Sequence, residues 1–92
     1  MAYLLHHFWT GGTEDQYRAM LKAVHPPTGL PEGQTHHVAG PTDGGFLITA
    51  VWDSRASADR FVQGLKAKMP VEGGFNGPLE ERGAEVVNLQ TS

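Results

Sequence analysis

The pattern of hydrophobic and polar residues changes period along the chain, and two of its runs predict central β-strands. Residues 3–9 (YLLHHFW) are aromatic or aliphatic except for two histidines, and the turn residues Gly11 and Gly12 follow them. Residues 46–52 (FLITAVW) are apolar except for Thr49. Neighbouring side chains of a strand point to opposite faces, and in both runs both faces are mostly apolar. We therefore expect both strands to be central and covered on both faces.

A period of about 3.6 residues predicts two helices. The first starts at a capping-box pattern in residues 13–16 and ends at the prolines of 26–27. Its apolar stripe consists of Tyr17, Met20, Leu21 and Val24. The second starts at Asp53 or Ser54 and ends at Pro70. Its apolar stripe consists of Ala58, Phe61, Val62 and Leu65.

The remaining segments predict two shorter strands and their connections. Residues 34–39 form a strand with two histidines, and the turn residues of 40–45 suit a tight hairpin with a glycine at positive φ. Residues 26–33, with three prolines and two glycines, predict an irregular loop. Residues 71–83 predict a long loop, for which a plain connection and a lid over a pocket both stay open, and the apolar residues of 84–90 predict a closing strand.

The order strand, helix, strand, strand, helix, strand predicts an α+β fold of the ferredoxin-like βαββαβ type. Its four-stranded antiparallel sheet has the order 4-1-3-2, with two helices on one face, and residues 1–92 form a single domain. Two helices cover only one face of such a sheet, yet its central strands are apolar on both faces. A large exposed apolar face marks an interaction surface, so we expect a homodimer through the sheet face.

Composition narrows the functional classes. The chain has 92 residues, a formal net charge of −3 and no cysteine, which excludes disulfides and thiolate chemistry. The negative balance argues against nucleic acid as a partner, since phosphate binding needs clustered positive charge. No apolar run approaches the roughly 18 residues of a membrane span, and no basic region precedes a hydrophobic stretch at the N-terminus. We expect a cytoplasmic protein with no membrane contact.

Four segments, spread over nearly the whole chain, carry a resemblance to known proteins. They are YLLHHFW at 3–9, HPPTGLPEG at 25–33, HHVAGPTDGGF at 36–46 and VWDS at 51–54. This combination resembles the dimeric α/β-barrel superfamily, and within it the small antibiotic-biosynthesis-monooxygenase-like proteins. The superfamily includes cofactor-free oxygenases, heme-degrading enzymes and isomerases, so the resemblance implies a fold and a pocket rather than one reaction.

Carrying the resemblance over residue by residue disfavours heme degradation. Heme-degrading members use an Asn on the first strand and a Trp and a His on the second helix. Here His7 lies near the Asn position, Phe61 takes the Trp position, and the second predicted helix has no His. The quinone-forming oxygenases hold a polyphenol with Asn, Trp and Tyr while dioxygen reacts with the substrate carbanion. The aromatic residues available here, none matched to that set by position, are Tyr3, Trp9, Tyr17 and Trp52.

Histidine is the residue type that most clearly offers chemistry. Four of the five histidines form the adjacent pairs His6-His7 and His36-His37, and each pair gives at most one imidazole to a given face. A side-chain pKa of about 6.5 suits proton abstraction at neutral pH, so we expect His7 and His36 to be catalytic. The alternative is that the pairs are structural and satisfied by hydrogen bonds. We expect His25 to help end the first helix by meeting its free carbonyls.

For substrate binding we expect Trp52, Phe61 and Tyr17, whose rings would line a pocket between the sheet and the helices. No histidine spacing with a neighbouring carboxylate indicates a metal site, and we expect no cofactor. The leading hypothesis is an enzyme that resembles cofactor-independent monooxygenases and acts on an aromatic or polyketide-like small molecule. The alternatives are an isomerase, lyase or cyclase on the same scaffold, and a non-enzymatic binding or dimerisation module.

Overall fold

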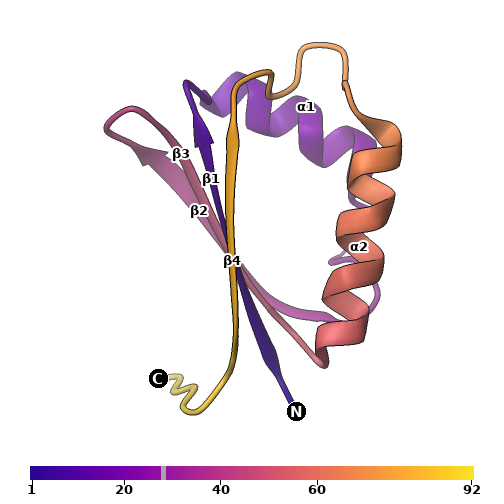
Figure 1. Ribbon diagram of the computed structural model, residues 1–92, viewed down its shortest axis with the longest axis vertical. Helices are drawn as coiled ribbons and strands as arrows, with labels where there is room; N and C mark the ends of the chain where they lie inside the picture. The colour runs from indigo at the N-terminus through magenta and orange to yellow at the C-terminus, as the bar shows by residue number, and fades with distance from the viewer. Residues whose placement is uncertain (28) are drawn as a thin grey trace.

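The computed structural model describes residues 1–27 and 29–92 and has the predicted order of strands and helices (Figure 1). The strands are β1 (Tyr3–Thr10), β2 (Gln34–Thr42), β3 (Gly45–Trp52) and β4 (Leu79–Glu85), and the helices are α1 (Glu14–Val24) and α2 (Arg55–Lys68). The strands form one antiparallel sheet in the order β2-β3-β1-β4, and both helices lie on one side of it. The predicted ferredoxin-like fold is confirmed.

Both helices start where side chains replace the missing backbone partners. Thr13 Oγ1 accepts from the Gln16 amide at 3.2 Å and Gln16 Oε1 accepts from the Thr13 amide at 3.1 Å, so the capping box is complete. At α2 the cap is Ser54, not Asp53, and its Oγ accepts from the Ser57 amide at 3.2 Å. No helix within the described residues is long and apolar enough to span a membrane.

The connections differ in part from their predictions. The tight hairpin with a glycine at positive φ is confirmed, since Gly44 turns the chain at a φ of +81°, but β2 continues to Thr42, beyond its predicted end at residue 39. The expected irregular connection joins α1 to β2, and Gly33 in it has a φ of +88°. Thr28, which the prediction included in this loop, lies outside the described residues.

The last strand corrects the prediction for residues 84–90. β4 spans Leu79–Glu85 and so begins inside the segment predicted to be a loop. β4 is an edge strand, and most of its side chains are exposed. Its sequence, LEERGAE, therefore carries many charged residues and has no apolar face that a sequence pattern could reveal. Its register sets Glu81 opposite His7, which brings a carboxylate to the helix side of the sheet.

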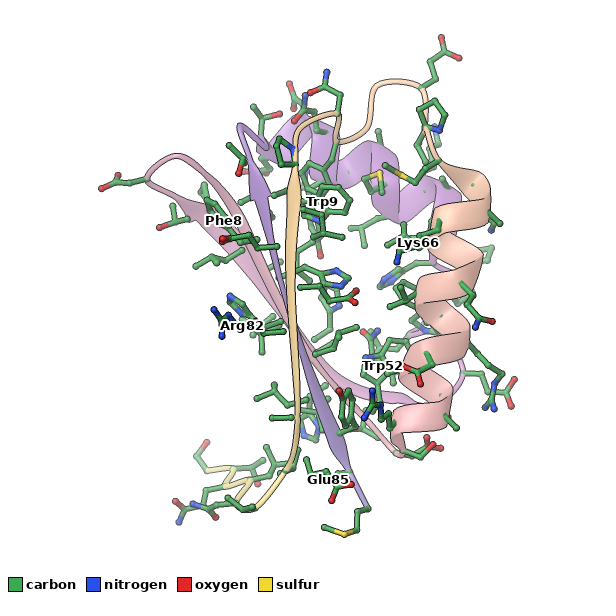
Figure 2. The ribbon with its side chains drawn as sticks, in the orientation of Figure 1. Phe8, Trp9, Trp52, Lys66, Arg82 and Glu85 are labelled. Atoms are coloured by element: carbon green, nitrogen blue, oxygen red, sulfur yellow. The ribbon has the colours of Figure 1, made fainter. Side chains whose placement is uncertain are left out.

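The two sides of the sheet are unequally covered. Trp9 and Trp52 lie on the helix side, whereas Phe8 and Arg82 lie on the other, which we call the open side (Figure 2). The open side also carries Leu4, His6, His36, Val38, Leu47, Thr49, Val51 and Glu80. Except for Val51, these side chains are partly or fully exposed. The expectation that β1 and β3 are buried on both faces is therefore wrong for the single chain.

Candidate functional site

A small cavity lies between the sheet and the two helices. It has a volume of about 50 Å³, enough for about four water molecules at some 10–15 Å³ each. Most of its wall is aliphatic or aromatic, and in the described residues no Lys, Arg, Asp or Glu lines it. The polar side chains on its wall, besides the indoles, are His7, Tyr17, His25, Gln34 and His37.

An open groove adjoins this cavity beside the C-terminal end of α1. The groove has a volume of about 570 Å³ and shares Leu21 and His25 with the cavity wall. His25 and Leu21 therefore border both spaces. The His25 ring meets the His37 ring edge-on at 5.1 Å and the Phe61 ring edge-on at 6.2 Å.

Tyr17, His37 and Gln34 form a hydrogen-bonded chain that joins α1 to the first residues of β2. His37 Nδ1 is 2.8 Å from Gln34 Oε1, and its Nε2 is 2.6 Å from the Tyr17 hydroxyl. Because the amide oxygen only accepts, Nδ1 carries a proton and donates. Burial lowers the pKa of His37, so the ring is neutral and Nε2 accepts the Tyr17 proton. Burial also raises the pKa of Tyr17, and the nearby charge of Arg18 opposes this in part.

His7 and Glu81 form a second hydrogen-bonded unit, between β1 and β4. His7 Nε2 donates to Glu81 Oε2 at 2.8 Å, which fixes the tautomer and leaves the lone pair of Nδ1 free to accept a proton. Burial lowers the pKa of His7, and the hydrogen bond and charge of Glu81 offset part of that shift. A neutral, oriented imidazole of this kind suits a general base.

Stacked aromatic rings form much of the remaining wall. Trp9 stacks on Phe75 with ring centres 4.9 Å apart, and the Trp52 and Phe61 rings are tilted by 41° with their centres 5.0 Å apart. Phe75 is 1% exposed and comes from the connection between α2 and β4. That part of the predicted 71–83 loop does fold over the pocket, but as a fixed part of the core.

Of the residues predicted from the sequence, His7, Trp52, Phe61 and Tyr17 line one cavity. The placement of His36 in the pocket is wrong. The pairing that starts at the hairpin, with Thr42 opposite Gly45, runs without a shift to His36, so His36 pairs with Val51 and lies exposed on the open side. Its Nδ1 is 2.9 Å from Thr35 Oγ1.

The pocket imidazole of the second pair is His37, and His25 does end α1 as expected, though through its backbone amide and not through its ring. The backbone amide of His25 donates to the Leu21 carbonyl at 2.9 Å, but its ring lines the cavity. Lys68, from α2, donates to the Ala23 carbonyl at 2.9 Å and so helps to cap α1. No group of three or more His, Asp or Glu within the described residues is arranged to hold a metal ion.

Comparison with known proteins supports the fold. No protein-family model matches the sequence, and no curated protein does. Among solved structures, a putative antibiotic biosynthesis monooxygenase from Chloroflexus aurantiacus J-10-fl has a TM-score of 0.65 at 18% identity, over 99% of this chain and 98% of that one. Rv0793 from Mycobacterium tuberculosis has a TM-score of 0.60 at 16% identity, with 98% of both chains covered.

The oxygenase SnoaB from Streptomyces nogalater is similar as well. Its TM-score is 0.57 at 12% identity, over 99% of this chain and 97% of that one, and it is described as a cofactor-independent oxygenase. The resemblance to antibiotic-biosynthesis-monooxygenase-like structures is thus confirmed at the level of the fold. Shared fold does not fix the reaction, which has to be argued from the cavity.

Proposed function

We propose that this protein is an enzyme of the cofactor-independent oxygenase type, acting on an aromatic or polyketide-like small molecule. The observation that carries the proposal is the Tyr17–His37–Gln34 chain on the wall of an aromatic cavity. It is a base whose tautomer is fixed, and it ends in a hydroxyl suited to contact a substrate. The likeness of the fold to SnoaB supports the same class.

The chemistry follows from where protons can move. A substrate O–H that donates to the Tyr17 oxygen passes its proton on, because the Tyr17 proton already points at His37 Nε2. His7 offers a second base through Nδ1, with Glu81 stabilising the imidazolium that forms. The resulting substrate anion reacts with dioxygen: a ring CH2 becomes C=O, and the second oxygen atom leaves as water. The substrate supplies all four electrons that reduce dioxygen, so no external reductant is needed.

The size of the cavity sets a condition on this proposal. Ligand sites typically run about 300 to 1,000 Å³, and this cavity has about 50 Å³. The adjoining groove of about 570 Å³ supplies the missing room once the His25 ring turns aside. We therefore place the substrate across the boundary that His25 forms, with its reacting ring inside.

The small volume of the cavity also favours one alternative, a non-enzymatic binding or dimerisation module. In that case the His7–Glu81 and Tyr17–His37 bonds only satisfy buried polar groups. An isomerase or cyclase on the same scaffold would use the same bases without consuming dioxygen. Oxygen uptake measured together with substrate conversion separates the three hypotheses.

The test is oxygen uptake with anthrone, an enolisable aryl ketone, at neutral pH. The double variant His7→Gln/His37→Gln should lose at least about a hundredfold in rate, the lower range of general-base contributions. The matched control, His6→Gln/His36→Gln, changes the other member of each pair and should keep the rate within about twofold. If anthrone and related hydroxylated aryl ketones are converted without oxygen uptake, the enzyme is an isomerase or cyclase. Equal rates for both double variants would refute the base assignment.

We further propose that a second copy of this chain covers the open side of the sheet. Apolar side chains such as Phe8, Leu47 and the 67%-exposed Val38 occupy it, which is the usual mark of an interaction surface. Glu80 and Arg82 lie on the same side, so a two-fold arrangement can set opposite charges against each other. Sedimentation should give twice the monomer mass of 10.0 kDa at micromolar concentration, and a monomer would contradict the proposal.

A further inference from the structure

The open groove beside the C-terminal end of α1 carries positive charge. Arg18 and Lys22, four residues apart on one face of the helix, both line it, and no Asp or Glu lines it within residues 1–27 and 29–92. Lys68, from α2, donates to the Ala23 carbonyl in the last turn of the same helix. Three of the seven Lys and Arg residues therefore gather here, although the chain has a net charge of −3.

The protein itself neutralises little of this charge. Lys22 makes no ion pair within the described residues. Arg18 donates to Glu14 Oε2 at 2.7 Å and 3.1 Å, but both side chains are more than half exposed, and exposed pairs of this kind contribute little. Lys68 offsets the negative end of the α1 dipole, which would otherwise repel an anion. A carboxylate in the groove can therefore take Lys22 and compete with Glu14 for Arg18.

The cavity next to the groove has the opposite character. Its wall is mostly apolar, and none of the described residues that line it is a Lys, Arg, Asp or Glu. An unpaired charge carried into such a space loses its hydration at a large cost in free energy. Because Leu21 and His25 border both spaces, a ligand that spans them keeps its ring in the cavity and any charged group in the groove.

We propose that the groove is a carboxylate subsite, which holds the acid group of an aromatic acid while the ring of the same molecule lies in the cavity. The proposal rests on the proposed function, which places the substrate across both spaces, and it deepens that function by naming the substrate class. Lys22 and Arg18 bind the carboxylate, and their charge fixes which end of the molecule enters the cavity. The two side chains thereby determine specificity without contacting the reacting ring.

The test uses two probes of nearly the same shape, 3-phenylpropanoate and 3-phenylpropanamide, which differ in charge. NMR titrations of the 15N-labelled chain at neutral pH and low ionic strength give both dissociation constants. The acid should bind about tenfold more tightly than the amide, because hydrogen bonds between charged groups are stronger than neutral ones. Added salt should reduce this preference, since it screens exposed charges.

Substitutions locate the source of the preference. The double variant Arg18→Gln/Lys22→Gln should reduce it to within about twofold. The matched control Arg55→Gln/Arg60→Gln removes two charges from α2, where neither side chain lines the groove or the cavity, and should keep it. All four side chains are exposed, so we expect both variants to fold. Lys22→Gln alone leaves the Glu14–Arg18 pair intact and should already weaken the preference, so the test does not depend on the double variant.

His25 gives a second measurement at the boundary between the two spaces. Burial and the neighbouring His37 lower the pKa of its ring. A carboxylate in the groove stabilises the imidazolium and should raise that pKa, whereas the amide should not. The two probes bury the ring to a similar extent, so the difference between them reports the charge.

The outcomes separate this proposal from the proposed function. If both probes perturb cavity signals such as those of Ile48 and bind equally well, the carboxylate subsite is overturned and the proposed function stands. A preference for the acid that survives in Arg18→Gln/Lys22→Gln also overturns it, because the charge is then bound elsewhere. If neither probe perturbs the cavity signals, the placement across both spaces fails together with the subsite, and oxygen uptake with the uncharged anthrone decides the proposed function by itself.

Discussion

The two sides of the sheet give neighbouring residues opposite environments. On the helix side, His7 and His37 are neutral imidazoles whose pKa values are lowered by burial, each held by one partner that fixes its tautomer. On the open side, the matching members of the pairs bond only to hydroxyls, His6 to Thr49 at 3.0 Å and His36 to Thr35 at 2.9 Å. One step along a strand separates a candidate base from a surface residue.

This difference shows that residue type alone does not make the site. The sheet supplies four imidazoles, and the helices make two of them chemically distinct by excluding water from one side. The helices also add groups that the strands lack, such as the Tyr17 hydroxyl and the His25 ring at the end of α1. The contrast between the sides can be tested with pairs of adjacent substitutions.

The largest expected contrast is in stability, between Trp9→Ala and Phe8→Ala. Trp9 is 5% exposed and stacks on Phe75, so its truncation should cost about 3–5 kcal/mol of unfolding free energy. Phe8 is half-buried on the open side, so its truncation to Ala should cost about 1 kcal/mol of unfolding free energy at concentrations where the chain is monomeric. Urea unfolding measures both. Equal losses at low protein concentration would mean that the open side is as well packed as the helix side.

The Phe8→Ala variant also bears on the proposed dimer. If a second copy covers the open side, the cost of this substitution should rise with protein concentration, because dimer formation stabilises the wild type by mass action. The cost of Trp9→Ala, on the helix side, should not depend on concentration in the same way.

Most of the fold follows from local signals in the sequence. The capping box at Thr13 and the apolar stripes identify both helices, and the apolar runs of β1 and β3 identify the central strands. β4 escapes prediction because an edge strand with four charged residues needs no apolar face. Its place in the sheet is set by pairing with β1, a contact between distant parts of the chain.

The site is less predictable, because it depends on details of register. His7, Tyr17, Trp52 and Phe61 follow from the faces of elements that the pattern identifies. His36 fails because the pairing that starts at the hairpin sets His37, not His36, on the cavity side, and the sequence of β2 has no apolar alternation to reveal it. Glu81 could have been found from the alternation of β4, had that strand been recognised.

The second prediction uses Glu81 and its neighbour Glu80, which lie on opposite sides of the sheet. Glu81 raises the pKa of His7 against the effect of burial, so Glu81→Gln should lower that pKa further. It should also slow turnover of an aryl ketone about tenfold, since an oriented base loses the carboxylate that stabilises its charged form. Histidine titration by NMR and oxygen uptake measure the two effects. Glu80→Gln should change neither, and a similar response in both variants would contradict the role of Glu81.

The smallest expected effect is the dependence of stability on pH. The pKa values of His7, His25 and His37 are lowered in the folded chain by burial, and His37 also lowers that of His25. Between those lowered values and the unfolded value of about 6.5, the unfolded chain binds more protons. Stability should therefore be flat above about pH 7.5 and fall as the pH drops through about 6.5.

Single histidine substitutions show which side of the sheet causes this change of stability with pH. Melting temperatures between pH 8 and pH 5 should fall less steeply in His37→Gln than in the wild type, because one group that resists protonation has been removed. His36→Gln should keep the wild-type slope, since its ring is exposed on the open side. The comparison uses slopes rather than absolute stabilities, so it is unaffected by the loss of the hydrogen bonds to Tyr17 and Gln34. If the two variants show the same slope, protonation of His37 in the cavity does not destabilise the fold. The two sides of the sheet would then not differ in how their imidazoles affect the pH dependence of stability.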